Sequence, residues 1–158
     1  MRQQDWLGVF PAITTPFTSA LAVDHVALAA HVEWQLGAGC RGIVALGSLG
    51  EGATLAADEK RDVLRTCCAT AAGRAPVVAG ISGLATSECV ELARDAERIG
   101  CDGLMVLPPY VYRGDQAETD AHFSAVLEAT ALSCMLYNNP IAYGTDLSAD
   151  EWARLADR

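Results

Sequence analysis

The sequence has one lysine, Lys60, and its eleven basic residues form neither a run nor a basic face. With a formal net charge of −9 at pH 7, such a chain is a poor match for the phosphate backbone of a nucleic acid. Long apolar runs are also missing. Segments such as residues 103–109 fall far short of the roughly 20 residues that cross a bilayer, and the N-terminus lacks the apolar run of a signal peptide. We therefore expect a cytoplasmic protein that binds neither nucleic acid nor membranes.

Metal-binding and disulfide patterns are missing as well, although six cysteines are present. No Cys-x-x-Cys pair occurs, and no histidine stands at ligand spacing. We interpret the cysteines, including Cys101 and Cys134 in or beside apolar segments, as small hydrophobic residues in a reducing environment. His25, His31 and His122 fall in helical patterns, and we interpret them as packing or surface residues.

The residues that are present have the composition of one soluble globular domain spanning residues 1–158, with 51% hydrophobic and 20% charged residues. Apolar segments alternate with helical patterns, which predicts an α/β fold. Asp24, and Thr86 or Ser87, are expected helix N-caps. The expected strands are residues 9–17, 42–47, 76–81, 102–107 and 133–137, and the expected helices are 24–37, 57–72, 86–99, 115–131 and 149–156.

This pattern leaves two architectures open. One is a doubly wound open sheet, and the other is the first five strand-helix units of a (β/α)8 barrel, which usually has about 250 residues. Residues 37–42 match Gly-x-Gly-x-x-Gly, but they close a helix and lead into a strand, which is the reverse of a dinucleotide-binding loop. A helix-ending turn is the better interpretation.

A second glycine-rich segment, residues 47–52 (Gly-Ser-Leu-Gly-Glu-Gly), does follow an expected strand. A turn of this kind can direct successive backbone N–H groups at an anion. It lacks the Lys-Ser/Thr pair of a phosphate-binding loop, so a carboxylate held by the Ser48 hydroxyl and neighbouring amides is the favoured ligand. The alternative is a tight structural turn.

Tyr137 ends the last expected strand and is followed by Asn-Asn-Pro at 138–140. Barrel enzymes place catalytic groups at such strand ends. A phenol there could transfer a proton with help from neighbouring hydroxyls or a cation, because the ordinary pKa of tyrosine is about 10. The alternative is a core tyrosine with a satisfied hydroxyl.

Taken in order, four segments resemble the dihydrodipicolinate synthase / N-acetylneuraminate lyase family along nearly all of the chain. They are residues 8–17 (Gly-Val-Phe-Pro-Ala-Ile-Thr-Thr-Pro-Phe), the Gly-x-x-Gly-Glu loop with Leu55 and residues 58–61, Pro-Pro-Tyr at 108–110, and Tyr-Asn-x-Pro at 137–140. The resemblance implies an incomplete (β/α)8 TIM barrel made of its first five units. It also implies a lyase or synthase that acts on pyruvate or a related 2-oxo acid without metal or organic cofactor.

In that family a lysine on the sixth strand forms a Schiff base with the oxo carbon. The resemblance implies that Tyr137 relays protons, that Ser48 extends this relay, and that the Ser48 and Leu49 amides hold the substrate carboxylate. Lys60, in the helix after the second strand, does not match the family's lysine. We therefore expect a chain that stops before its nucleophile and is inactive alone. The alternative is a non-catalytic 2-oxo acid binding or assembly module.

Three positions depart from the family's pattern. Leu49 replaces the usual threonine, and Val111 stands where the synthase has a tyrosine that enters a partner subunit, with Tyr112 one residue away. Ala142 stands where the synthase has an arginine for its second substrate. These departures disfavour lysine biosynthesis and favour a sugar-acid, hydroxyproline-derived or other 2-oxo acid lyase. The family forms tetramers, and we do not extend that assembly to this shorter chain.

Overall fold

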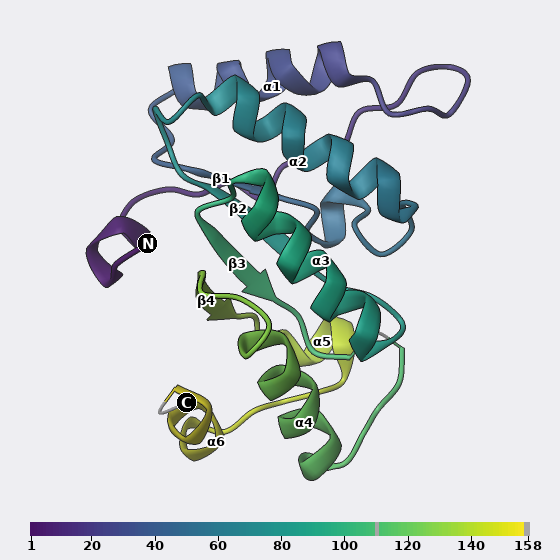
Figure 1. Cartoon of the computed structure of the whole chain (residues 1–158), viewed down its shortest axis with the longest axis vertical. Helices are drawn as coiled ribbons and strands as arrows, with labels where there is room; N and C mark the ends of the chain where they lie inside the picture. The colour runs from purple at the N-terminus through teal and green to yellow at the C-terminus, as the bar shows by residue number, and fades with distance from the viewer. Residues whose placement is uncertain (110, 157–158) are drawn as a thin grey trace.

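The structure is a computed structural model that describes residues 1–109 and 111–156. Tyr110, the last residue of the Pro-Pro-Tyr motif, lies outside the described residues. A parallel sheet with the order β1-β2-β3-β4 forms the centre of the described chain (Figure 1). Its strands are β1 (Ile43–Ala45), β2 (Val77–Ile81), β3 (Gly103–Val106) and β4 (Ser133–Leu136).

Helices connect the parallel strands and follow one another along the sheet, as right-handed crossovers require (Figure 1). The α-helices are α1 (His25–Gly37), α2 (Ala57–Ala71), α3 (Thr86–Ile99), α4 (Gln116–Leu127), α5 (Pro140–Tyr143) and α6 (Ala149–Ala156). Two short 3-10 turns are η1 (Gln3–Trp6) and η2 (Ser48–Gly50). The α/β architecture predicted from the sequence is confirmed.

The predicted first strand, residues 9–17, is wrong as a strand. This segment touches β1 through a single parallel bridge between Ala12 and Val44, with Ile13 N–H donating to the Val44 carbonyl at 2.9 Å. Pro11 and Pro16 have no N–H to donate, so a continuous ladder cannot form. The segment is held in place along the sheet by isolated hydrogen bonds, and the sheet has four strands instead of five.

A side-chain cap explains where α1 begins, whereas α3 begins without one. The Asp24 carboxylate accepts a hydrogen bond from the Ala27 N–H at 2.9 Å and caps α1, as predicted. The predicted cap of α3 is wrong, because its N-cap is Ala85 and makes no side-chain cap bond. The Thr86 hydroxyl instead pairs with His122 Nδ1 at 2.9 Å.

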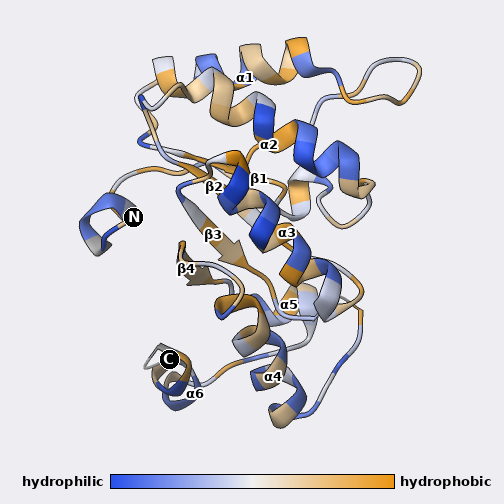
Figure 2. Ribbon diagram, in the orientation of Figure 1, coloured by the Kyte–Doolittle hydropathy of each residue, from blue (hydrophilic) through white to orange (hydrophobic). Residues whose placement is uncertain are grey.

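Strand residues alternate between two apolar layers, and this alternation fixes which side chains face the site. Ile43, Ala79 and Leu104 belong to the layer that the helices cover. Val44 and Met105 belong to the opposite, inner layer, together with Val78, Leu107 and Tyr143. Figure 2 shows hydrophobic strands, with hydrophilic residues on the outer sides of α2 and α3. The burial of both sheet faces agrees with the continuous apolar runs of the sequence.

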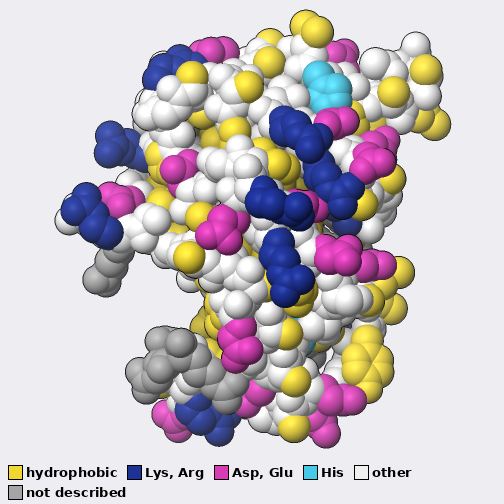
Figure 3. Space-filling model, in the orientation of Figure 1, with side chains coloured by type: hydrophobic (Ala, Val, Ile, Leu, Met, Phe, Trp, Pro, Cys, Tyr) yellow, Lys and Arg dark blue, Asp and Glu magenta, His cyan; other side chains and the backbone are white. Residues whose placement is uncertain are grey.

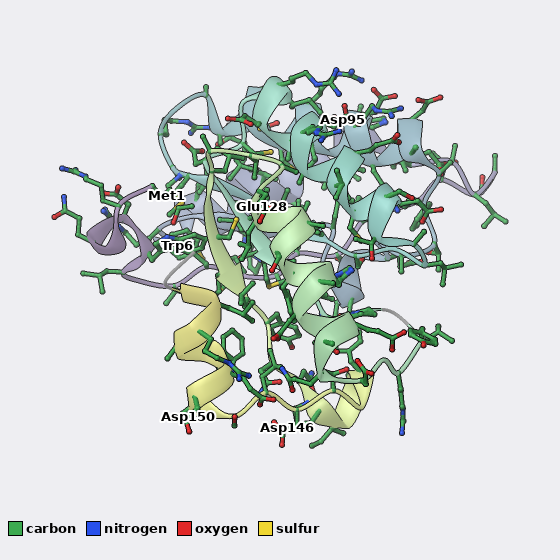
Figure 4. All side chains as sticks on the ribbon, turned by 60° about the horizontal axis from the view of Figure 1, so that its bottom comes forward. Met1, Trp6, Asp95, Glu128, Asp146 and Asp150 are labelled. Atoms are coloured by element: carbon green, nitrogen blue, oxygen red, sulfur yellow. The ribbon has the colours of Figure 1, made fainter. Side chains whose placement is uncertain are left out.

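The outer surface of α2 and α3 carries charges of both signs (Figure 3). Asp95 is 8% exposed and accepts hydrogen bonds from Arg61 Nε at 2.6 Å and Arg98 Nη2 at 2.5 Å. Figure 4 labels Asp95 on α3. Opposite charges are therefore interleaved on this face.

Trp6, also labelled in Figure 4, donates its indole N–H to Ser133 Oγ at 3.0 Å. Among the described helices, none is long and apolar enough to cross a membrane.

His122 is a buried titratable group of α4 that contacts the residue following β3. It is 4% exposed, and its Nε2 lies 3.3 Å from the carbonyl oxygen of Leu107. With Nε2 donating to that carbonyl, Nδ1 accepts from the Thr86 hydroxyl, so both ring nitrogens are paired in the neutral form. Burial lowers the pKa of His122 below its ordinary value, an effect only partly offset by the Leu107 carbonyl.

We expect the free energy of unfolding to fall as the pH drops from 7.5 to 5.5. The pKa of His122 is lower in the folded state than in the unfolded state, so the unfolded state takes up a proton first as the pH falls. The stability that neutral His122 gives the folded state is therefore lost as the pH falls through the unfolded value of 6.5. The slope from one such proton is at most about 1.4 kcal/mol per pH unit. Urea unfolding at both pH values tests this, and His122→Gln should flatten the dependence. An unchanged slope in His122→Gln would contradict the assignment.

Candidate active site

The loops that the sequence singles out lie at the same edge of the sheet, because parallel strands share one carboxyl end. Ser48 and Leu49 follow β1, at one side of the sheet, and Tyr137 follows β4 at the other. The described hydrogen bonds pair Ser48 with Tyr143 and Tyr137 with Asn139. Tyr143 also packs its ring against that of Tyr137, so it contacts both predicted catalytic residues, although no sequence motif indicates it.

The Ser48–Gly50 turn is built by backbone geometry. Gly50 N–H donates to the Gly47 carbonyl at 2.9 Å, and Glu51 N–H donates to the Ser48 carbonyl at 3.2 Å. The amides of Ser48 and Leu49 open this turn, and the first amides of a helical turn have no acceptor within it. The turn therefore presents two adjacent N–H groups beside the Ser48 hydroxyl.

Two glycines allow the loop to fold back on β1. A Cβ at Gly52 would lie 2.1 Å from the Leu46 carbonyl oxygen, and a Cβ at Gly50 would lie 2.9 Å from that of Ile13. The Gly50 carbonyl accepts a 2.7 Å hydrogen bond from the buried Thr15 hydroxyl. Thr15 thus fixes the loop to the N-terminal segment.

Tyr137 is half-buried at the end of β4, with its N–H donating to the Val106 carbonyl at 2.8 Å. Its hydroxyl accepts a hydrogen bond from Asn139 Nδ2 at 3.1 Å. Asn138 Nδ2 donates to Asp146 Oδ1 at 3.1 Å, and Leu147 N–H donates to Asn138 Oδ1 at 3.3 Å. Figure 4 labels Asp146 in this loop. The two asparagines therefore hold the strand end and the turn after it in one geometry.

Tyr143 is a candidate site residue that the sequence motifs do not indicate. It ends the short helix α5, is 8% exposed in the inner apolar layer, and hydrogen-bonds through its hydroxyl to Ser48 Oγ. Its ring meets that of Tyr137 edge to face, with centroids 6.2 Å apart and an interplanar angle of 75°. The sequence signal was Pro140 three residues before a Tyr-Gly pair, a short turn that returns the chain to the strand end.

The positions that depart from the family's pattern lie exposed around this edge. Leu49 is 71% exposed, and Val111 is 78% exposed with a positive φ of 73°. Ala142 is exposed on α5. A cation also lies close by, because a Cβ at Gly144 would come within 2.6 Å of the guanidinium carbon of Arg113. Arg113 therefore lies over the end of α5.

Lys60 is far from these groups in the fold. It lies on α2, half-buried, and lines an outer cavity of about 340 Å³ together with Glu88 and Asp95 of α3. The helices stand outside the sheet, whereas the site is on the inner side. This location agrees with the expectation that Lys60 does not match the family's Schiff-base lysine.

A further cavity of the described residues also lies away from the predicted site. It measures about 670 Å³ and lies between α4, β4 and α6, lined mostly by apolar residues that include Leu136 and Trp152. None of the predicted site residues borders it. Within the part of the chain that the structure describes, no group of three or more His, Cys, Asp or Glu residues is arranged to hold a metal ion.

The order of strands and helices, with hydroxyl-bearing loops at the carboxyl ends of β1 and β4, is that of the N-terminal part of a TIM-barrel enzyme. The family model of the Dihydrodipicolinate synthetase family matches residues 5–158. The chain belongs to this family, as the sequence motifs indicated.

Similar proteins include a curated synthase and two crystal structures. The 4-hydroxy-tetrahydrodipicolinate synthase of Agrobacterium fabrum is 43% identical over 94% of this chain and 50% of its own length. The crystal structure of YagE from E. coli K12, in complex with pyruvate, has a TM-score of 0.92 at 33% identity and covers 96% of this chain and 51% of that one. A pyruvate complex of dihydrodipicolinate synthase from Acinetobacter baumannii has a TM-score of 0.90 at 36% identity and covers 95% and 52%. The chain spans about half the length of the curated relatives it matches.

We expect Ser48→Ala and Tyr143→Phe to be non-additive in stability, because each removes one partner of the same hydrogen bond. Urea unfolding of the two single variants and the double variant should give a coupling energy of about 0.5–1.5 kcal/mol. Tyr112→Phe is the matched control, since Tyr112 is 58% exposed and pairs with Glu118 instead. Fully additive effects of Ser48→Ala and Tyr143→Phe would show that the pair contributes nothing.

Proposed function

We propose that this chain carries the carboxylate-binding loop and the proton-relay tyrosines of a lyase or synthase that acts on pyruvate or a related 2-oxo acid through a lysine Schiff base. One observation carries the proposal. Ser48 at the end of β1 and Tyr137 at the end of β4 are connected by Tyr143, which bonds to the first and packs edge-on against the second. Family membership and the pyruvate complexes of two similar structures agree with it.

The substrate's carboxylate would be held by the Ser48 hydroxyl and by the Ser48 and Leu49 amides, which open the turn after β1. Leu49 contributes only its amide, because its side chain has no hydroxyl. Charge-assisted hydrogen bonds of this kind are stronger than neutral ones. The oxo carbon would then lie on the inner side of the sheet, toward the phenol of Tyr137.

Imine formation requires that an amine attacks the oxo carbon and that the oxo oxygen leaves as water, so two protons must move from the amine nitrogen to the oxygen. In this proposal Tyr137 would transfer these protons, and the hydroxyls of Tyr143 and Ser48 would continue the path. Asn139 donates to the Tyr137 oxygen at 3.1 Å, which leaves the phenol proton free to point elsewhere. We assign Tyr137 and Ser48 the catalytic roles, with Tyr143 between them.

The amine is the group that this sequence does not place at the site. Lys60 lines a cavity between outer helices, on the other side of the sheet from Tyr137. We therefore propose that the 158-residue chain binds a 2-oxo acid but forms no imine by itself. The choice of substrate stays open to experiment, with Ala142 as a residue that departs from the synthase's pattern and Arg113 as a cation beside Gly144.

We expect Ser48→Ala to weaken pyruvate binding about fivefold or more, which corresponds to the loss of one hydrogen bond to a charged group. Ligand-observed NMR titration of pyruvate measures this, and Ser87→Ala, an exposed serine of α3, is the matched control. Equal affinities of the wild type and Ser48→Ala would exclude the loop as the carboxylate site. Borohydride added with saturating pyruvate should leave no lysine adduct in the intact mass, whereas stoichiometric labelling of Lys60 would contradict the proposed inactivity.

A second candidate function is assembly, and the edge of β4 favours it. The β4 residues are half-exposed or exposed, unlike those of β1, β2 and β3, and the 670 Å³ cavity adjoins them. Unpaired strand edges template pairing with further strands. We propose that residues 1–158 form one partial barrel domain whose β4 edge pairs with another chain or segment.

If the edge drives assembly, Met135→Lys should shift the molecular mass toward the monomer, because a charge on an edge strand opposes pairing. Met135 is 38% exposed on β4, and the 70% exposed Leu84 offers the control Leu84→Lys away from the sheet edge. Sedimentation velocity over a concentration series measures the shift. Assembly that is equally sensitive to both variants would point to general hydrophobic association instead.

A further inference from the structure

Two of the six thiols face each other across the outer side of the sheet. Cys67, Cys89 and Cys101 are buried and Cys40, Cys68 and Cys134 are half-buried, all as free thiols. The Sγ atoms of Cys68, in the second half of α2, and Cys101, in the turn between α3 and β3, lie 3.8 Å apart. The three buried cysteines thus pack as the small hydrophobic residues that the sequence predicts. Half-buried Cys68 combines a close thiol partner with access to solvent.

We propose that Cys68 and Cys101 form a reversible disulfide when a low-molecular-weight disulfide such as oxidised glutathione is present. A disulfide bond is about 2.0 Å long, so the sulfurs have to approach by roughly 1.8 Å, a movement within reach of side-chain rotation. Each residue also belongs to a separate crossover, 33 residues apart in the sequence. The bond would therefore connect α2 to the start of β3.

The two thiols differ in the way a reactive pair requires. A hydrogen bond from Cys101 lowers the pKa of Cys68, which favours the Cys68 thiolate, whereas the same bond and burial raise the pKa of Cys101. Burial raises the pKa of Cys67 to about 12 and that of Cys134 to about 11. Cys68 is thus placed as the attacking thiolate and Cys101 as the resolving thiol.

The exchange balances with one small disulfide as oxidant. The Cys68 thiolate attacks a sulfur of the small disulfide, whose S–S bond breaks and releases one thiolate. Cys101 then loses its proton and attacks Cys68 Sγ, which forms the internal bond and releases the second small thiol. Two protein thiols are oxidised, and one small disulfide is reduced to two thiols.

The pair lies at the opposite end of the sheet from the candidate site. Cys101 precedes β3, whereas Ser48 and Tyr137 follow β1 and β4, and helices between parallel strands return the chain to their amino ends (Figure 1). Oxidation would therefore change the stability of the fold without covering the carboxylate loop. The inference is independent of the proposed function.

The experiment is to incubate the native chain with oxidised glutathione, block remaining thiols after denaturation, and map tryptic peptides without reduction. We expect a loss of two hydrogens from the intact mass and a cross-link between the peptides 66–74 and 99–113. Cys68→Ala and Cys101→Ala should abolish this cross-link, and Cys67→Ala should retain it, which resolves the two cysteines of the first peptide. A cross-link that survives in Cys68→Ala would overturn the assignment, as would native protein that accepts glutathione at Cys68 without releasing it.

Two further measurements separate the native pair from random oxidation. Cys40 and Cys134 are half-buried like Cys68 but bond to Gln35 and to the Leu132 carbonyl, so they should give mixed disulfides only. In guanidinium-unfolded protein the linkages should scatter over all six cysteines. The oxidised chain should melt roughly 4–10 °C higher than the reduced chain, because the bond closes a loop of 33 residues. An oxidised chain with an unchanged or lower Tm would show that the folded structure does not accommodate the bond.

Discussion

The parallel register of the four strands is the constraint on which the rest of the structure depends. The ladder pairs Val44 with Val78, and Gly80 with Met105. A slip of one residue would turn Val78 and Met105 out of the inner layer, because successive side chains of a strand point to opposite faces. The same register brings the loop after β1 and the turn after β4 to one edge. Tyr143 can then reach Ser48, although the two residues are 95 positions apart in the sequence.

The sequence predicts the parts of this fold in which local pattern and tertiary structure agree. The apolar runs at 42–47, 76–81 and 102–107 contain β1, β2 and β3, and both of their faces are buried as continuous hydrophobicity indicates. The first predicted strand failed because its prolines remove donors that a ladder needs. The α3 cap failed for another reason: Thr86 satisfies the buried ring of His122, a tertiary demand that no local rule contains.

The site shows the same division. The loop at 47–52 and Tyr137 could be predicted because each stands directly after a strand, where parallel sheets collect their functional groups. Tyr143 ends the four-residue helix α5, and only the folded chain reveals its contact with Ser48. Asn138 and Asn139 follow the predicted strand directly, and the structure shows that their side chains bond to Leu147 and Tyr137.

Substitutions around this edge redistribute polar groups instead of only removing them. Leu49 takes a hydroxyl away from the turn after β1, but Tyr143 brings a phenol to Ser48 in the same turn. Ala142 leaves no cation at its own position, and Arg113 lies over Gly144 two residues further on. Both replacements come from other segments of the chain and approach from different directions. On the proposed function, a site rearranged in this way would hold a small carboxylate through the backbone amides, while the groups that contact the remainder of the substrate would differ. Family membership therefore constrains the reacting end of the substrate more strongly than its distal end.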